Sequence, residues 1–126
     1  MCDRELEAEI YRLRFYETRR GTSPARDFLD SLAERVRAKA AVWLGLLQER
    51  GPDLRRPYAD VVEGAIRELR VSHGRIEVRL LYFVDGKDIV LTHGFVKKTR
   101  RVPAGEVEKA LRCLDAWIAG KGGALP

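Results

Sequence analysis

A cluster of cations follows a short apolar segment in the last third of the chain. Lys97, Lys98, Arg100 and Arg101 lie within five residues, directly after Gly94-Phe95-Val96. At the end of a strand, such a cluster can hold several phosphate groups and neutralise negative charge that develops on one of them. Short basic runs are also common in solvated loops, so this interpretation needs support from neighbouring residues.

Two hairpins are predicted just before the cluster. Asp85-Gly86 is typical of a type I′ turn, because both central positions of that turn need positive φ. The register set by this turn places Arg79 opposite Thr92. His73-Gly74 predicts a similar turn one strand earlier, so three consecutive antiparallel strands are expected.

Charged residues then share one face of the predicted sheet. With both turns in place, Arg70 faces Glu77 and Glu68 faces Arg79, beside Thr92. This polar area next to an apolar one is a place where a substrate could bind. The alternative is purely structural, since opposite charges on adjacent strands stabilise an exposed sheet by roughly 0.2–1 kcal/mol per pair.

The histidines and tryptophans favour structural roles. His73 has the side-chain type suited to proton transfer near neutral pH, but it falls in a predicted turn, where histidines are usually just exposed. His93 falls on the predicted core face and is expected to be a hydrogen-bonded packing residue. Trp43 and Trp117 lie on apolar helical stripes and are expected in the core.

The surrounding elements are predicted from periodicity. Residues 11–16 alternate as a strand, and Ser23-Pro24 begins a helical segment that runs to about Arg50, as one helix or as two with a bend near Asp30. Residues 57–64 are interpreted as a loop. Strands are expected at 65–71, 75–84 and 87–96, and a helix follows residues 103–105, with a flexible tail from about residue 120.

These elements predict one α+β domain over residues 1–126. The order is β-α-α-β-β-β-α, with a mostly antiparallel four-stranded sheet and the helices packed on one face. A net charge of +5 and a pI near 9.5 make polyanions plausible partners. Neither a signal peptide nor a membrane span is recognised, and Cys2 and Cys113 form no metal or redox motif, so a reduced cytoplasmic protein is expected.

Three segments together resemble a known family. They are GAIRELR (64–70), RLLY (79–82) and GFVKKT (94–99). Their order and spacing are similar to those of phage-derived, HigB-like toxins of the RelE superfamily, in type II toxin-antitoxin systems. The resemblance extends from the first strand through the final helix, and it implies the same small RelE-like fold.

The resemblance also implies an activity. Such toxins enter the ribosomal A site and cleave mRNA, and a helix-turn-helix antitoxin encoded nearby blocks them. The implied chemistry is attack of a ribose 2′-hydroxyl on the adjacent phosphate, without a metal or another cofactor. It needs a base, cations around the phosphate and an acid for the leaving oxygen.

The resemblance assigns roles to individual residues. Arg79 matches the strand arginine that contacts the scissile phosphate, and its planar guanidinium suits bidentate binding. Lys97 and Lys98 match basic residues that stabilise the transition state or bind a flanking phosphate, and Arg70 is expected to orient the substrate. The residues expected to bind RNA elsewhere are Arg67, Thr99, Arg100 and Arg101.

The chain departs from the family pattern at the base. Relatives of the RelE type carry a catalytic tyrosine or histidine near the C-terminus, whereas this chain has no tyrosine after Tyr82 and no histidine after His93. Glu68 stands where relatives often carry a lysine. Glu68, Glu77 or His73 could act as the base instead. The alternative function is a non-catalytic, phage-derived module of the same fold that binds nucleic acid or protein.

Overall fold

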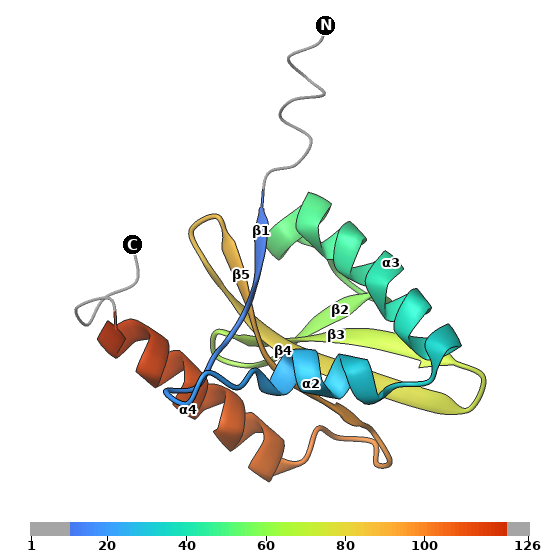
Figure 1. The fold of residues 1–126 in the computed structure, drawn as a ribbon. Coiled ribbons are helices and arrows are strands. Elements are labelled where there is room, and N and C mark those ends of the chain that lie inside the picture. Colours follow the sequence, from blue (N-terminus) through green and yellow to red (C-terminus); the bar gives the residue numbers. More distant parts are fainter. Residues whose placement is uncertain (1–10, 121–126) are drawn as a thin grey trace, which may run out of the picture.

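The computed structural model describes residues 11–120, which form a five-stranded sheet with helices on both faces (Figure 1). The elements in chain order are β1 (Arg12–Phe15), α2 (Pro24–Ser31), α3 (Glu34–Arg50), the 3₁₀ helix η1 (Gly51–Asp53), β2 (Ala59–Glu63), β3 (Ile66–His73), β4 (Ile76–Asp85), β5 (Asp88–Val96) and α4 (Ala104–Gly120). The strand order is β1-β5-β4-β3-β2. The α+β class is confirmed, but the sheet has one strand more than predicted.

The two hairpin turns are displaced by one residue from their predicted positions. Gly74-Arg75 joins β3 to β4 and Gly86-Lys87 joins β4 to β5, with glycine first in each turn at φ 61° and 62°. Positive φ at the first position alone is the pattern of a type II′ turn, so the predicted type I′ is wrong. Because each strand shifts by one residue, every side chain before the β5 bulge keeps its predicted face.

The extra strand is β2, in the segment that was predicted to be a loop. It pairs antiparallel with β3 at the edge of the sheet. Val61 and Val62 are β-branched and suit a strand, and Ala59 is fully buried in the core. The flanking Pro57 and Gly64 concealed the strand because they leave only a few residues between two turn signals.

The first strand, β1, closes the opposite edge. It runs parallel to β5, whereas all other pairs are antiparallel. The Asp88 carboxylate accepts a 2.8 Å hydrogen bond from Arg12 Nε and a 3.3 Å hydrogen bond from Arg14 Nε. Burial alone would raise the pKa of Asp88, but the two arginines outweigh it and the pKa is lowered. This ion pair fixes β1 at the start of β5.

Helices α2 and α3 cover one face of the sheet. Ser23 caps α2 with its Oγ on the Arg26 amide, and Pro24 is the first helical residue, as predicted. The helical segment is indeed two helices, which separate at Leu32 and Ala33. The core on this face is made by apolar residues of both helices and of β3, β4 and β5.

Helix α4 packs on the opposite face, so the prediction that all helices share one face is wrong. A separate apolar cluster contains Ile66, Leu81, Phe83 and Val90 of the sheet and Ala110 of α4. These strand residues form the apolar area that the sequence predicted beside the charged one, for which no covering helix was predicted. An apolar half-face needs cover, and α4 provides it while leaving the charged half open.

A bulge in β5 changes which residues face α4. Tyr82 pairs with Leu91 but Leu81 pairs with His93, so Thr92 is an extra residue. His93 and Phe95 therefore lie on the α4 face, whereas the regular alternation had predicted the other face. Arg79 consequently faces Phe95 and not Thr92.

His93 links this bulge to the first turn of α4. Its Nε2 lies 2.9 Å from Glu106 Oε1 and its Nδ1 lies 3.1 Å from Thr92 Oγ1, while only 7% of the residue is exposed. The expected role of His93 as a hydrogen-bonded packing residue is confirmed, but His93 lies on the α4 face of the sheet and not on the α2 and α3 face. Burial lowers the pKa of His93, although the hydrogen bond with Glu106 acts in the opposite direction.

Other sequence expectations concern the ends of the chain and the membrane. The predicted flexible tail and Cys2 lie outside the described residues. The Cys113 thiol is free, and burial raises its pKa. Among residues 11–120, the structure contains no helix with the length and apolar character needed to cross a membrane.

Gly94→Ala is expected to destabilise the fold. A Cβ at this position would overlap the side chains of Phe28 and Leu80, which predicts a loss of about 1–3 kcal/mol in the free energy of unfolding. Urea unfolding measures it. Gly105→Ala is the control, because a Cβ there meets no atom within 4 Å; equal effects of the two substitutions would contradict this packing.

The free energy of unfolding is expected to decrease as the pH is lowered, because of His93. The folded-state pKa is below the ordinary value of 6.5, so the unfolded chain takes up the proton first as pH falls through that value. The free energy of unfolding should therefore decrease more between about pH 7.5 and 5.5 in the wild type than in His93→Gln. His73→Gln controls for the loss of one histidine, and parallel pH profiles of wild type and His93→Gln would count against the assignment.

Candidate phosphate-binding groove

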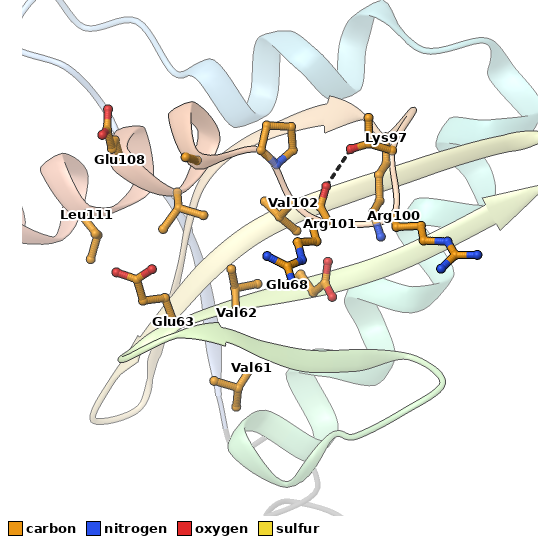
Figure 2. A pocket seen from close by; sticks show the side chains of 14 residues that line it. Val61, Val62, Glu63, Glu68, Lys97, Arg100, Arg101, Val102, Glu108 and Leu111 are labelled. Atoms are coloured by element: carbon orange, nitrogen blue, oxygen red, sulfur yellow. Dashed lines mark hydrogen bonds between the residues drawn. The ribbon is translucent and has the colours of Figure 1, made fainter.

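A groove of about 1100 Å³ lies between the edge of the sheet and α4, and we call it the β2–α4 groove (Figure 2). It is bounded by β2, by the start of β3, by the segment that follows β5, and by the first half of α4. Its lining residues are Val61, Val62, Glu63, Glu68, Lys97, Thr99, Arg100, Arg101, Val102, Pro103, Ala104, Val107, Glu108 and Leu111.

The predicted cationic cluster supplies one wall of this groove. Lys97, Arg100 and Arg101 line it, whereas Lys98 does not. The segment is held at two points: the Lys97 amide donates to the Glu77 carbonyl at 2.7 Å, and Thr99 Oγ1 donates to the Arg101 carbonyl at 2.7 Å. The sequence thus located the cluster correctly but could not separate the two adjacent lysines.

Glu68 supplies a carboxylate at the same groove. It projects from β3, is 7% exposed, and is the only predicted base candidate among the groove-lining residues. Its Oε1 lies 3.2 Å from Arg79 Nε, without the geometry of a hydrogen bond. Figure 2 shows Glu68 below the segment that carries Lys97 and Arg101. A buried carboxylate and exposed cations therefore share one cavity.

Arg79 lies beneath the groove and does not line it. Its side chain is 4% exposed and is held by two carboxylates, Glu68 and Glu77, each at 3.2 Å. Its Nη1 also donates to the Val78 carbonyl at 3.0 Å. A guanidinium held in this way is not open to a phosphate, so the structure gives Arg79 a different position from the one that the resemblance implied.

The predicted pairing of Arg79 with Glu68 is found, but not in the expected register. Arg70 is the residue directly opposite Arg79, and Glu68 is opposite Leu81. The contact between Glu68 and Arg79 is therefore diagonal across the two strands. The expected pair of Arg70 with Glu77 is not found, because the observed register places Glu77 opposite Ser72, and its carboxylate contacts Ser72 and Arg79.

Glu77 is held in its ionised form. A 2.8 Å hydrogen bond from Ser72 is the largest cause that lowers the pKa of Glu77, and Arg79 and Arg70 lower it further against the effect of burial. A carboxylate stabilised in this way is a weaker proton acceptor. Glu77 also lies outside the groove lining, so it is a poorer base candidate than Glu68.

The remaining predicted site residues lie away from the groove. Arg67 donates from Nη1 to the Pro52 carbonyl at 2.9 Å. His73 ends β3 opposite Ile76, beside the turn into β4. Neither residue lines the β2–α4 groove, and Arg70 does not line it either.

Sequence reasoning missed the wall that β2 and α4 contribute. Val62 and Glu63 come from the strand that was predicted as a loop, and Glu108 and Leu111 come from a helix that was expected on the other face. The Val61-Val62 pair was the available signal for β2. The position of α4 had a signal too, in the apolar half-face that lacked cover.

The geometry allows phosphate binding and proton transfer in one place. Arginine and lysine side chains bind phosphate oxygens, and a carboxylate in the same cavity can accept a proton from a bound hydroxyl group. Arg79 does not line the groove, but it contacts Glu68 at 3.2 Å.

Comparison with known proteins gives one family. A search of curated proteins finds no match. The model of the family described as "Phage derived protein Gp49-like (DUF891)" matches residues 27–115, from α2 into α4. This range covers well over half of the chain and contains all the strands except β1, together with every residue that lines the β2–α4 groove. The chain therefore belongs to the phage-derived Gp49-like family.

Proposed function

We propose that this protein is a toxin of the RelE/HigB type that cleaves mRNA, with the β2–α4 groove as its active site. The Gp49-like family is related to such toxins. The observation that carries the proposal is the meeting of the buried Glu68 carboxylate with Lys97, Arg100 and Arg101 in one groove. Cleavage by an adjacent hydroxyl group needs both kinds of group together.

Glu68 acts as the general base in this proposal. It takes the proton from the ribose 2′-hydroxyl, the 2′-oxygen forms a bond to the adjacent phosphorus, and the bond from phosphorus to the 5′-oxygen breaks. The leaving oxygen takes up a proton from water or from Lys97. The products are a 2′,3′-cyclic phosphate and a free 5′-hydroxyl, so no atom of the protein is consumed.

The cations stabilise the reacting phosphate. Arg101 and Lys97 neutralise the charge on the non-bridging oxygens, and Arg100 holds a flanking phosphate. Arg79 is a positioning residue: its guanidinium keeps the Glu68 carboxylate in place at the groove. In this proposal the groove cations contact the phosphates and Arg79 does not, which differs from the direct phosphate contact that the family resemblance implied for Arg79.

The partners follow from the same proposal. Translating ribosomes in the cytoplasm present the mRNA, and the overall charge of +5 favours association with the ribosome. A helix-turn-helix antitoxin is the expected inhibitor. A reading frame for such a protein beside the gene, and slow growth when the toxin is expressed without it, are the corresponding genetic expectations.

A non-catalytic binding module is the competing function. It is favoured by the placement of the histidines and of Tyr82: His93 is bonded to Glu106, His73 lies outside the groove, and Tyr82 is buried on the α2 and α3 side. The two proposals agree on RNA binding and differ on cleavage. The next experiment separates them.

Glu68→Gln is expected to reduce mRNA cleavage on translating ribosomes by about 10²–10⁴-fold, the usual effect of losing a general base. RNA binding should be retained, because the cations remain. Mapping of mRNA 5′ ends measures cleavage, and urea unfolding checks the fold, since Glu68 is paired with buried Arg79. Glu49→Gln in α3 is the control. Wild-type protein that binds ribosomes but leaves mRNA intact would establish the binding module instead.

Lys97→Ala and Lys98→Ala form a matched pair, because they are adjacent and only Lys97 lines the groove. Lys97→Ala should weaken binding of single-stranded RNA and lower the slope of log K against log salt by about one, whereas Lys98→Ala should change the slope much less. Filter binding at several salt concentrations measures both. Equal slopes for the two variants would show that RNA binding depends on the charge of these lysines and not on their position relative to the groove.

A further inference from the structure

A second groove lies at the C-terminal end of α4, and we call it the β1–α4 groove. It has a volume of about 960 Å³ and is formed by β1, by the loop that follows β1, by Arg26 of α2 and by the last residues of α4. It shares no lining residue with the β2–α4 groove. Nothing in the proposed cleavage reaction uses it.

The floor of the β1–α4 groove is aromatic. Phe15, Tyr16 and Trp117 line it and are each partly buried. Phe15 packs with the core on the α2 and α3 side, whereas Tyr16 and Trp117 pack with the cluster under α4. Trp117 packs edge-on against Phe83 with ring centroids 6.1 Å apart, and its Nε1 donates a hydrogen bond to the Asp85 carboxylate. Rigid aromatic side chains of this kind anchor protein interfaces at little entropic cost.

The rim of the groove carries more positive than negative charge. Arg14, Arg19 and Arg26 line it together with one acidic residue, Glu17. Arg14 shares Asp88 with a second arginine and keeps half of its side chain exposed. Within residues 11–120, neither Arg19 nor Arg26 has a carboxylate partner within 4.0 Å. The rim is therefore complementary to an acidic ligand.

The aromatic floor is better suited to a peptide than to stacked bases. The Arg26 guanidinium already lies 4.7 Å from the centroid of the Phe15 ring and covers one ring face. Aromatic residues combined with arginine are the composition enriched at protein interfaces, and carboxylates can bind guanidinium groups in a bidentate manner.

We propose that the β1–α4 groove binds an acidic amphipathic segment of a partner protein. The apolar side chains of the segment pack on Tyr16 and Trp117, and its carboxylates bind Arg19 and Arg26. Because the two grooves lie at opposite ends of α4 and share no lining residue, this segment can be bound while the β2–α4 groove is open. The proposal does not depend on RNA cleavage.

Peptide display identifies the chemistry that this groove selects. Random peptides are selected on the wild-type protein and counter-selected on Arg19→Glu/Arg26→Glu. The surviving sequences should be enriched in Asp and Glu that alternate with large apolar residues. Basic or uncharged survivors would overturn the proposal, as would a selection that yields no peptide dependent on the two arginines.

Tryptophan fluorescence then locates the binding site. The chain has two tryptophans, so Trp43→Phe leaves Trp117 as the sole tryptophan reporter, and in that background the selected peptide should shift its emission in a saturable way. Arg19→Glu/Arg26→Glu should weaken binding about tenfold or more. The charge-matched control, Arg35→Glu/Arg50→Glu in α3, should change it less than about twofold.

Two results would contradict the groove as a peptide site. Equal weakening by the control pair would mean that only net charge matters. Displacement of the peptide by a single-stranded oligouridine, with the same dependence on Arg19 and Arg26, would instead assign the groove to nucleic acid. Circular dichroism of each variant shows whether the fold is retained.

Discussion

The burial of one positive charge constrains the charged half of the sheet. Arg79 lies under the β2–α4 groove with 3% of its surface exposed, and an isolated guanidinium at such a depth would be strongly unfavourable. Two carboxylates compensate it, Glu68 from β3 and Glu77 from β4. The buried guanidinium of Arg79 therefore fixes the positions of both carboxylates by charge pairing. The chemistry that the groove can perform depends on that arrangement.

Helix α4 contributes to both grooves. Its apolar side covers Leu81, Phe83 and Val90, its first half lines the β2–α4 groove and its last residues line the β1–α4 groove. His93 connects the first turn of α4 to the bulge in β5. A change in the position of α4 would therefore alter the shape of both grooves. This makes α4 the element through which the two grooves can influence each other.

Much of the fold was predictable because local rules determine it. Alternation gave β1 and three consecutive strands, and Ser23-Pro24 gave the start of α2. Even the misplaced turns preserved the faces, because a shift of one residue in both strands keeps their parity. The strand β2 was missed because its five residues lie between a proline and a glycine, and short edge strands carry little periodic signal.

The candidate site was less predictable, for a physical reason. The cationic cluster is contiguous in sequence and was found, whereas the environment of Arg79 depends on how β4 pairs with its neighbouring strands. A bulge has no period of its own, so the inversion of His93 and Phe95 was not visible in the pattern. Arg79 was expected to be exposed to substrate. The tertiary contacts that bury its guanidinium are not visible in the sequence.

The parallel pairing of β1 with β5 has a consequence for the order in which the chain folds. Strands β2 to β5 are neighbours in sequence and can form their hairpins early, because only short loops must close. The contact between Arg12 and Asp88 joins residues 76 positions apart, and such a closure is entropically costly. We therefore expect the four-stranded meander to form the nucleus and β1 to dock late, so that the β1–α4 groove is completed only in the last stage of folding.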